Sequence, residues 1–354
     1  MKLLTVRIKP LEPLMLRGSG EYDPSSRGVF SHAQSLLFPR PSTIIGMLIS
    51  TFMSLGHTNL KCININSWSD LLDCYSSTFD VLGIKTIRGS YLYNPKENEV
   101  YVPLRLDKRV LLVNYRQLIH CLLAHPDYGN VLDKLFLDPY NEELLYALKD
   151  VSRVLEEKYS LEVEEHWRVG IGLKVRKERG YTKTTEEGYI YTARYIAYLK
   201  DIEIRFKIIV RNKEAKVRSL IGKTLLVKFG GEHRAVRMTI DDEVSDIIDD
   251  VLNMTTFNYA LLLSPMPLYN RVYLGYIGEY DIIGLGFSIA RKRRKPLYPA
   301  ILEGSVMRVE ARQGISKHEL LHSGLYYALD LNSNYEYRVL GRIGYASYVP
   351  LTLD

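Results

Sequence analysis

The middle of this chain is a series of strand-like segments, which limit its possible folds more than any other feature. Residues 166–175, 188–199, 202–210 and 224–238 are rich in β-branched and aromatic residues, as β-strands typically are. Helical periodicity with one apolar face occurs on both sides of this region, at 42–55, 141–158, 241–254 and 316–329. The pattern predicts an α+β fold with two small antiparallel sheets of roughly four strands, each set with two helices.

Further segments complete two sets of elements. Residues 3–8 predict a first strand, 90–104 predict a hairpin around an Asn-Pro turn, and a final strand is expected from Tyr335. A length of 354 residues favours two domains. Because no flexible linker separates the two sets, we expect them to pack together.

Composition excludes several classes of protein. No stretch reaches about 18 uninterrupted apolar residues, so no membrane-spanning helix is expected. The N-terminus alternates apolar and polar residues up to Pro10 without the apolar core of a signal peptide, which favours a cytoplasmic protein. Cys62, Cys74 and Cys121 form no CxxC pair, so neither a disulfide framework nor a thiolate zinc site is indicated.

Charge is segregated along the chain. Residues 168–183 carry six cations against one carboxylate, a local net charge of +5, and 291–295 read RKRRK. Residues 241–250 carry six carboxylates and no cation. Such separation is typical of a protein with distinct binding faces.

The string HELLH at 318–322 matches a zinc-binding motif. His318 and His322 would share a helix face, with Glu319 as general base. A catalytic zinc needs a third protein ligand, and the first downstream glutamate, Glu336, falls in the strand expected from Tyr335. We therefore expect a helix face that packs against the second sheet, and a zinc hydrolase remains an alternative.

Two other segments are candidate anion sites. Arg40, Ser42 and Thr43 stand at the start of the helix at 42–55, where free N–H groups and the positive end of the helix dipole attract anions. In FGGEHR, 229–234, two glycines precede His233 and Arg234. Glycines allow a backbone to approach RNA closely, although a tight turn explains them equally well.

Taken in order, several of these segments resemble one family. The segments are LEPLMLRG (11–18), PRPSTIIGML (39–48), RVGIGL with EEGYIYTARYIAYL (168–173 and 186–199), FGGEHRAVRM (229–238) and KPLYPAILEGSV (295–306). Their order and spacing are similar to those of the RAMP-superfamily subunit that binds the crRNA 5′ handle in type III-B (Cmr) CRISPR effector complexes. The resemblance covers nearly the full chain.

The resemblance implies two ferredoxin-like (RRM-like) domains with antiparallel sheets. The first would span 1–240, with a large insertion at about 57–165 and a protruding thumb-like hairpin at about 172–190. The second would span 241–354.

The implied function is structural. Such a subunit holds the crRNA 5′ handle and joins the large polymerase-domain subunit to the backbone RAMP subunits, with indirect access to target RNA. The resemblance implies no catalysis, metal or cofactor, and no membrane contact. An alternative is a RAMP-type metal-independent endoribonuclease in which His32, His166 or His233 acts as general acid or base.

The residues of the thumb support RNA binding independently of the resemblance. Clustered cations neutralise phosphates, and Tyr181, Tyr189 and Tyr191 offer stacking surfaces. The carboxylates of 241–250 would repel RNA, so we expect them to face solvent or a protein partner. The residues expected to bind RNA are Arg17, Arg40, Ser42, Thr43, His166, Arg168, Lys174, Arg176, Lys177, Arg179, Tyr181, Lys183, His233, Arg234, Arg291, Arg293 and Arg294.

Overall fold

The computed structural model describes most of the chain. It covers residues 2–16, 32–33, 35–57, 68–106, 109–171, 175–178, 181–185, 190–211, 216–231, 234–242, 246–252, 254–269, 274–284, 287–288, 293–294, 297–309 and 316–353. Within these ranges only the backbone is described at 32–33, 68, 169–171, 175–178, 181–185, 190–192, 287–288 and 293–294.

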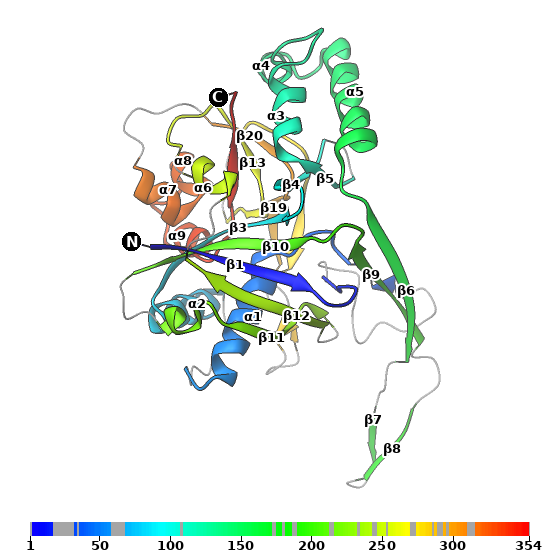
Figure 1. The fold of residues 1–354 in the computed structure, drawn as a ribbon, viewed down its shortest axis with the longest axis vertical. Coiled ribbons are helices and arrows are strands. Elements are labelled where there is room, and N and C mark those ends of the chain that lie inside the picture. Colours follow the sequence, from blue (N-terminus) through cyan, green and yellow to red (C-terminus); the bar gives the residue numbers. More distant parts are fainter. Residues whose placement is uncertain are drawn as a thin grey trace.

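The largest element is a seven-stranded antiparallel sheet, the principal sheet (Figure 1). Its strands, from edge to edge, are β11 (Thr224–Phe229), β12 (Arg234–Asp241), β1 (Lys2–Pro10), β10 (Glu203–Val210), β3 (Ile84–Asn94), β4 (Glu99–Leu104) and β5 (Leu111–Asn114). The order β12-β1-β10-β3 is that of a ferredoxin-like βαββαβ unit. Its first helical connection consists of α1 (Pro41–Ser54) and α2 (Trp68–Leu82), whereas the second is reduced to a 3₁₀ turn, η1 (Lys216–Leu220).

A second, four-stranded sheet follows the same order. It runs β15 (Tyr276–Ile277), β20 (Val306–Arg308), β13 (Tyr259–Leu262) and β21 (Tyr348–Leu351), with α7 (Lys317–Ser323), α8 (Leu325–Ala328) and α9 (Tyr335–Arg342) between β20 and β21. Beside it lie β14 (Met266–Pro267), β19 (Leu297–Ile301) and β16 (Tyr280–Gly284), and the short pair β17 (Phe287–Ser288) and β18 (Arg293–Arg294). The expected α+β class with two ferredoxin-like antiparallel sheets is confirmed, but the principal sheet has seven strands instead of roughly four, because β11, β4 and β5 extend its edges.

Two expectations for the C-terminal region are wrong. Tyr335 begins a helix and not a strand, because the Asn334 side chain accepts the N–H of Glu336 and caps α9. The single helix expected at 316–329 is divided at Gly324, whose φ of +62° lies in the left-handed region. A Cβ at Gly324 would stand 2.6 Å from the carbonyl oxygen of Ala346, so the close approach of these two segments requires glycine.

A long hairpin projects from the principal sheet (Figure 1). Its base is β6 (Val163–Ile171) paired with β9 (Ile190–Tyr198), beside which β2 (His32–Ala33) forms a third strand. Its tip is the pair β7 (Val175–Glu178) and β8 (Tyr181–Thr185), which lies farther from the body than any other element in Figure 1. The protruding hairpin expected of this fold is therefore present, whereas its bounds at about 172–190 stay a prediction.

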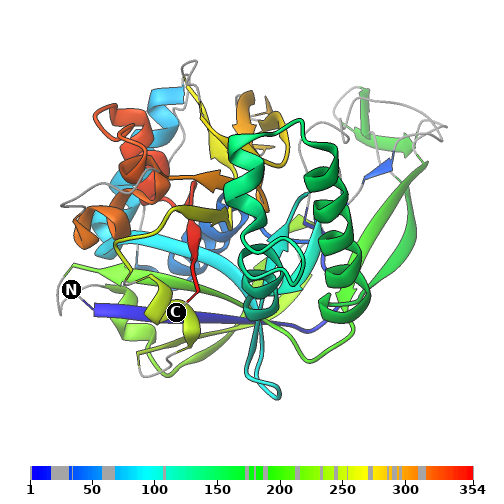
Figure 2. The ribbon, with the colours of Figure 1, turned by 90° about the horizontal axis from the view of Figure 1, so that it is seen from above.

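The region 57–165 was expected as one insertion, but its helix α2 belongs to the first helical connection of the principal sheet. Strands β3, β4 and β5 belong to the principal sheet. A helical lobe follows, made of α3 (Tyr115–Leu123), α4 (Val131–Leu137) and α5 (Glu142–Tyr159). In Figure 2 the lobe stands between the C-terminal helices and the base of the hairpin.

The two sheets share one continuous hydrophobic core. Polar contacts also join them: the buried Arg88 of β3 donates from Nη1 to the carbonyl oxygen of Gly341 at 2.6 Å, and Arg342 donates from Nη2 to that of Ile84 at 3.0 Å. The expected close packing of the two sets is thus observed, whereas a domain boundary at 240/241 stays a prediction.

Most of the described carboxylates of 241–250 do not face solvent or a partner as expected, although Asp250 is exposed. The helix of this segment, α6 (Ile247–Val251), is shorter than predicted because Asp241 ends β12. Asp241 pairs with Arg7, Asp242 with Lys2, and Asp246 and Asp249 with the buried Lys207. These carboxylates neutralise cations of β1 and β10, contacts between residues far apart in sequence.

The cysteine expectation also needs correction. Cys74 of α2 is disulfide-bonded, whereas Cys121 carries a free thiol whose pKa is raised by burial. None of the described helices is long and apolar enough to cross a membrane.

Candidate nucleic-acid interface

The base of the hairpin gathers three of the predicted RNA-binding residues. In the register of β6 and β9, His166 stands opposite Tyr195, and Arg168 stands opposite Ala193. Because side chains two apart on a strand share a face, His166 and Arg168 lie on the Tyr195 face of this pair. The Arg168 guanidinium carbon is 5.4 Å from the centre of the Tyr195 ring.

Arg234 reaches the same ring from the first residue of β12. Its guanidinium carbon lies 4.2 Å from the centre of the Tyr195 ring, and both residues are buried. Cations of two strands far apart in sequence therefore meet over one aromatic ring, an arrangement that cation–π attraction stabilises. We call His166, Arg168, Tyr195 and Arg234 the Tyr195 cluster.

Glu12 holds Arg234 in place. It accepts a hydrogen bond from Arg234 Nη1 at 2.6 Å and another from the backbone N–H of Ala235 at 2.7 Å. The Ala235 N–H and the Arg234 guanidinium hold the pKa of Glu12 below its usual value. The carboxylate is thus charged at neutral pH and fixes the guanidinium against the tyrosine.

The two glycines of FGGEHR join this turn to the segment 11–16. The N–H of Gly231 donates to the carbonyl oxygen of Met15 at 2.6 Å. Gly230 has a φ of +71°, and a Cβ there would stand 2.5 Å from the same oxygen. Leu14 in turn pairs with Ile196 of β9 through backbone hydrogen bonds of 2.7 and 2.9 Å. The glycines therefore serve a tight turn against protein backbone, one of the two explanations left open by the sequence.

The opposite face of the hairpin base carries an exposed aromatic residue. Trp167 is 54% exposed, and the Arg194 guanidinium lies over its ring at 6.0 Å from the centre. Arg194 also pairs with Glu165 at 3.1 Å. An exposed indole beside a guanidinium provides a surface on which a base can stack.

The tip continues the positive charge of the base. Arg176 and Lys177 lie in β7, and Tyr181 and Lys183 lie in β8. Lys174 and Arg179, predicted with them, lie outside the described residues. We call the projecting element that carries this base and this tip, strands β6 to β9, the basic hairpin.

Arg40 lies elsewhere and is not a free cation. It precedes α1, is 8% exposed, and its Nη2 is 3.3 Å from an Oε atom of the buried Glu303. Ser42 and Thr43 are partly buried in the first turn of α1, and neither side chain caps the helix. Arg40 thus links α1 to the LEGSV segment of the C-terminal half, and a phosphate contact there stays a prediction.

No described contact joins the remaining predicted RNA-binding residues to the Tyr195 cluster. Arg293 and Arg294 form β18, described by backbone alone. Arg17, His233 and Arg291 lie outside the described residues, as does the side chain of His32. His166 Nε2 is 3.6 Å from a carboxylate oxygen of Glu164.

The HELLH string lies in α7, which buries Leu320 but packs on α9, on α8 and on β3 of the principal sheet rather than on the second sheet as expected. His318 Nε2 contacts Lys85 Nζ. Burial lowers the pKa of His322 to about 4, and the nearby charge of Arg88 adds to this effect. Cations beside both imidazoles oppose a metal cation, and no group of three His, Cys, Asp or Glu within the described ranges is placed to hold one.

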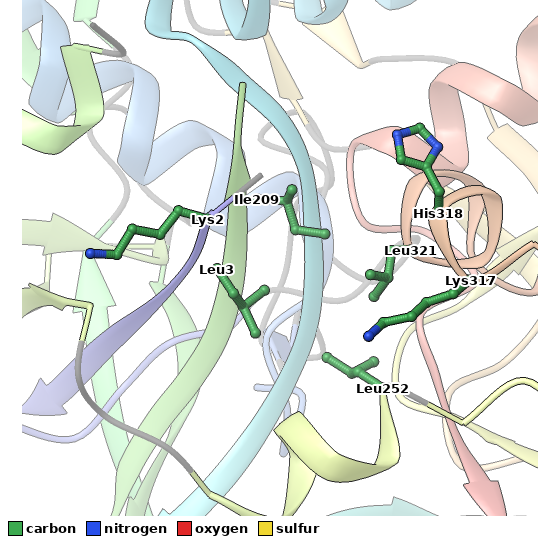
Figure 3. A pocket seen from close by; sticks show the side chains of 7 residues that line it. All are labelled: Lys2, Leu3, Ile209, Leu252, Lys317, His318 and Leu321. Atoms are coloured by element: carbon green, nitrogen blue, oxygen red, sulfur yellow. The ribbon is translucent and has the colours of Figure 1, made fainter. Parts of the chain in front are cut away.

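Helix α7 also borders a pocket of about 410 Å³ (Figure 3). Its apolar side is formed by Leu3, Ile209, Leu252 and Leu321, and Lys2, Lys317 and His318 complete the lining. In Figure 3 the imidazole of His318 points away from these apolar side chains. The pocket therefore does not assemble the HELLH side chains into a site.

Four residues of the hairpin base were not predicted individually: Glu12, Trp167, Arg194 and Tyr195. Trp167 stands between two residues that were, and it is one of only two tryptophans in the chain. Period-two alternation from His166 would have placed Trp167 on the opposite face of the strand. The role of Glu12 had no local signal, because its partner is 222 residues away.

No family model matches the chain, but a curated protein and solved structures do. The CRISPR system CMR subunit Cmr3 of Saccharolobus solfataricus is 32% identical over 314 residues, covering 86% of this chain and 85% of the relative. Chains in two cryo-EM structures of type III-B Cmr-beta, bound to cognate target RNA with and without AMPPnP, are 27% identical to it. Their TM-scores are 0.64 and 0.65, and each match covers 98% of this chain and 96% of the other.

Proposed function

Since this chain belongs to the family of the CRISPR system CMR subunit Cmr3, we propose that it is the non-catalytic subunit that holds the crRNA 5′ handle in a type III-B complex. The observation that carries the proposal is the basic hairpin, which projects from the body with Arg and Lys residues in its tip strands. At its base it exposes Arg168 and also Trp167, with the Arg194 guanidinium over the indole ring. Phosphates and unstacked bases are the groups that such a surface recognises.

The proposed mechanism separates two tasks. Cations of the tip neutralise the RNA backbone, which positions the RNA without reading its sequence. At the foot of the hairpin, Trp167 and the Arg194 guanidinium offer a surface on which an unpaired nucleobase of the RNA can stack. The same subunit would join the large subunit to the backbone subunits, a role implied by the family resemblance.

The salt dependence of RNA binding tests this proposal. The experiment measures the affinity of the purified chain for a crRNA carrying the 5′ handle, by fluorescence anisotropy over a series of KCl concentrations. Each single-strand phosphate contact contributes about −0.7 to the slope of log K against log salt. Replacing Arg176, Lys177 and Lys183 by Ala should therefore flatten the slope by about 2.

The matched control removes the same charge from the helical lobe, outside the basic hairpin. Lys134, Lys149 and Lys158 are exposed on the helical lobe, and their replacement by Ala also lowers the net charge by three. That variant should keep the wild-type slope. Equal slopes for both variants and the wild type would refute RNA binding by the basic hairpin. RNA cleavage by the wild type in EDTA that is lost in His166→Ala would support the endoribonuclease alternative.

A further inference from the structure

The tip of the helical lobe exposes apolar and tyrosine side chains, of which Tyr146 has the Lys149 ammonium over its ring, 5.3 Å from the centre. The exposed fractions are 78% for Leu137, 89% for Tyr140, 67% for Tyr146 and 40% for Leu145. These residues occupy the end of α4, the α4–α5 turn and the first turns of α5. We call Leu137, Tyr140, Leu145 and Tyr146 the lobe patch.

The lobe is held together by its other face. Leu144, Leu148, Val151 and Leu155 of α5 are buried, and they recur at the spacing of one helix face. Phe136 of α4 stacks on Tyr259 of β13 at 5.5 Å between ring centres. The core of the lobe is formed without the side chains of the lobe patch. The exposure of these side chains is therefore better explained by contact with another molecule than by folding of the lobe.

The charge around the lobe patch favours a protein partner over a nucleic acid. The lobe, 115–159, carries eight carboxylates against five Lys and Arg, a net charge of −3 in a chain whose total is +6. Asp138, Glu142 and Glu143 are exposed directly beside the lobe patch. Carboxylates repel a nucleic-acid backbone, whereas a rim of carboxylates around apolar and tyrosine side chains complements a protein surface rimmed by Lys and Arg.

The position of the lobe patch is compatible with a protein partner that binds at the same time as RNA. The α4–α5 turn lies at one end of the longest axis of the molecule, and the tip of the basic hairpin lies at the other (Figure 1). A protein bound at the lobe patch would thus leave the RNA-binding hairpin accessible.

We propose that the lobe patch is a docking surface for another protein subunit of the same effector complex, one that presents an apolar recess rimmed by cations. The proposal rests on the proposed role of the chain within a type III-B complex. Tyrosines are frequent among the residues that dominate the energy of such interfaces, so Tyr140 and Tyr146 are the expected anchors.

The first test uses a double substitution, Leu137→Asp with Tyr140→Asp. The variant and the wild type are each purified, and the remaining subunits of the complex are purified without this chain. Biolayer interferometry then measures the affinity of each form of the chain for those subunits. We expect at least a tenfold loss of affinity, as is common when a hot-spot residue is removed. Leu226→Asp is the matched control, since Leu226 is a 74% exposed leucine of β11.

Wild-type affinity in the double variant would overturn the proposal, as would an equal loss in the Leu226→Asp control. The RNA salt slope of the double variant separates the two proposals. An unchanged slope with lost subunit binding supports docking by the lobe patch, whatever the fate of the proposed RNA role.

The second test does not depend on the folding of a charged variant. A photo-crosslinking amino acid is placed at position 140, and the assembled complex is irradiated and analysed by mass spectrometry. Crosslinks to a different protein subunit support the proposal. Crosslinks to RNA, to a second copy of this chain, or to neither would overturn it.

Discussion

Single residues connect segments that lie far apart in this sequence, and Glu12 is the clearest case. Its carboxylate binds Arg234, whose guanidinium stacks on Tyr195, which in turn contacts Arg168. Each of these residues comes from a different strand or from the segment 11–16. The position of every cation over the ring therefore depends on the backbone turns that bring the segments together.

The turn at Gly230 is the most sensitive of these. We expect Gly230→Ala to destabilise the fold by about 3 kcal/mol, because the new Cβ would clash with the Met15 carbonyl in addition to the strain of a left-handed backbone. Gly222→Ala is the control: its φ is +74°, but nothing lies within 4 Å of the new Cβ, so only the backbone strain of about 1 kcal/mol is expected. Urea denaturation measures both, and equal losses would show that the clash is relieved.

His322 predicts a pH dependence of stability. Its pKa is about 4 in the folded chain and 6.5 as a reference, so the unfolded chain binds the extra proton first as the pH falls. Its contribution is fully present above pH 6.5 and declines towards pH 4, by up to about 2 kcal/mol after allowance for partial exposure. Thermal melts of His322→Gln should show a weaker loss between pH 6.5 and 4.5 than the wild type. His120→Gln, at an exposed position of α3, is the control for the substitution itself.

At the scale of elements, α6 shows how a short helix is held on the principal sheet. Asp246 accepts hydrogen bonds from Tyr91 at 2.6 Å and Arg205 at 3.1 Å, and it lies 3.4 Å from the fully buried ammonium of Lys207. Asp249 binds the same ammonium at 2.8 Å. The helix is thus attached by charge as well as by the burial of Ile248 and Val251.

Removing the charge of Asp246 should therefore be costly. We expect Asp246→Asn to lower the free energy of unfolding by about 3 kcal/mol, since it leaves buried cations undercompensated. Asp242→Asn removes a carboxylate whose partner Lys2 is 42% exposed, and it should cost less than about 1 kcal/mol. Chemical denaturation at neutral pH compares the two variants, and similar losses would contradict the central role of the buried network.

The elements differ in how well the sequence predicts them. The α5 helix and the two strands of the hairpin base were predicted to within a few residues of their bounds. Of the apolar residues expected on the buried face of α5, Leu145 is exposed. Helix α9 was missed because YEYRV alternates like a strand, although the preceding Asn334 is a typical N-cap. The partners of Asp246 and Arg234 could not be predicted, because charge patterns show which residues are ionised but not which distant strand lies opposite.

At the scale of the whole molecule, the two sheets are expected to unfold together. Arg88 and Arg342 donate to backbone carbonyls across the junction, and the hydrophobic core runs through both sheets without interruption. Differential scanning calorimetry should therefore show one transition, with equal calorimetric and van't Hoff enthalpies. Two resolved transitions would mean that each sheet is a separate cooperative unit.

The opposed charges of the basic hairpin and the helical lobe have a kinetic consequence. Separated along the longest axis, they give the molecule a large electric dipole moment. The field of a long polyanion exerts a torque on such a dipole and turns its positive end forward before any contact forms. The molecule should therefore meet RNA already oriented, and the fraction of productive collisions should fall as added salt shortens the range of that field.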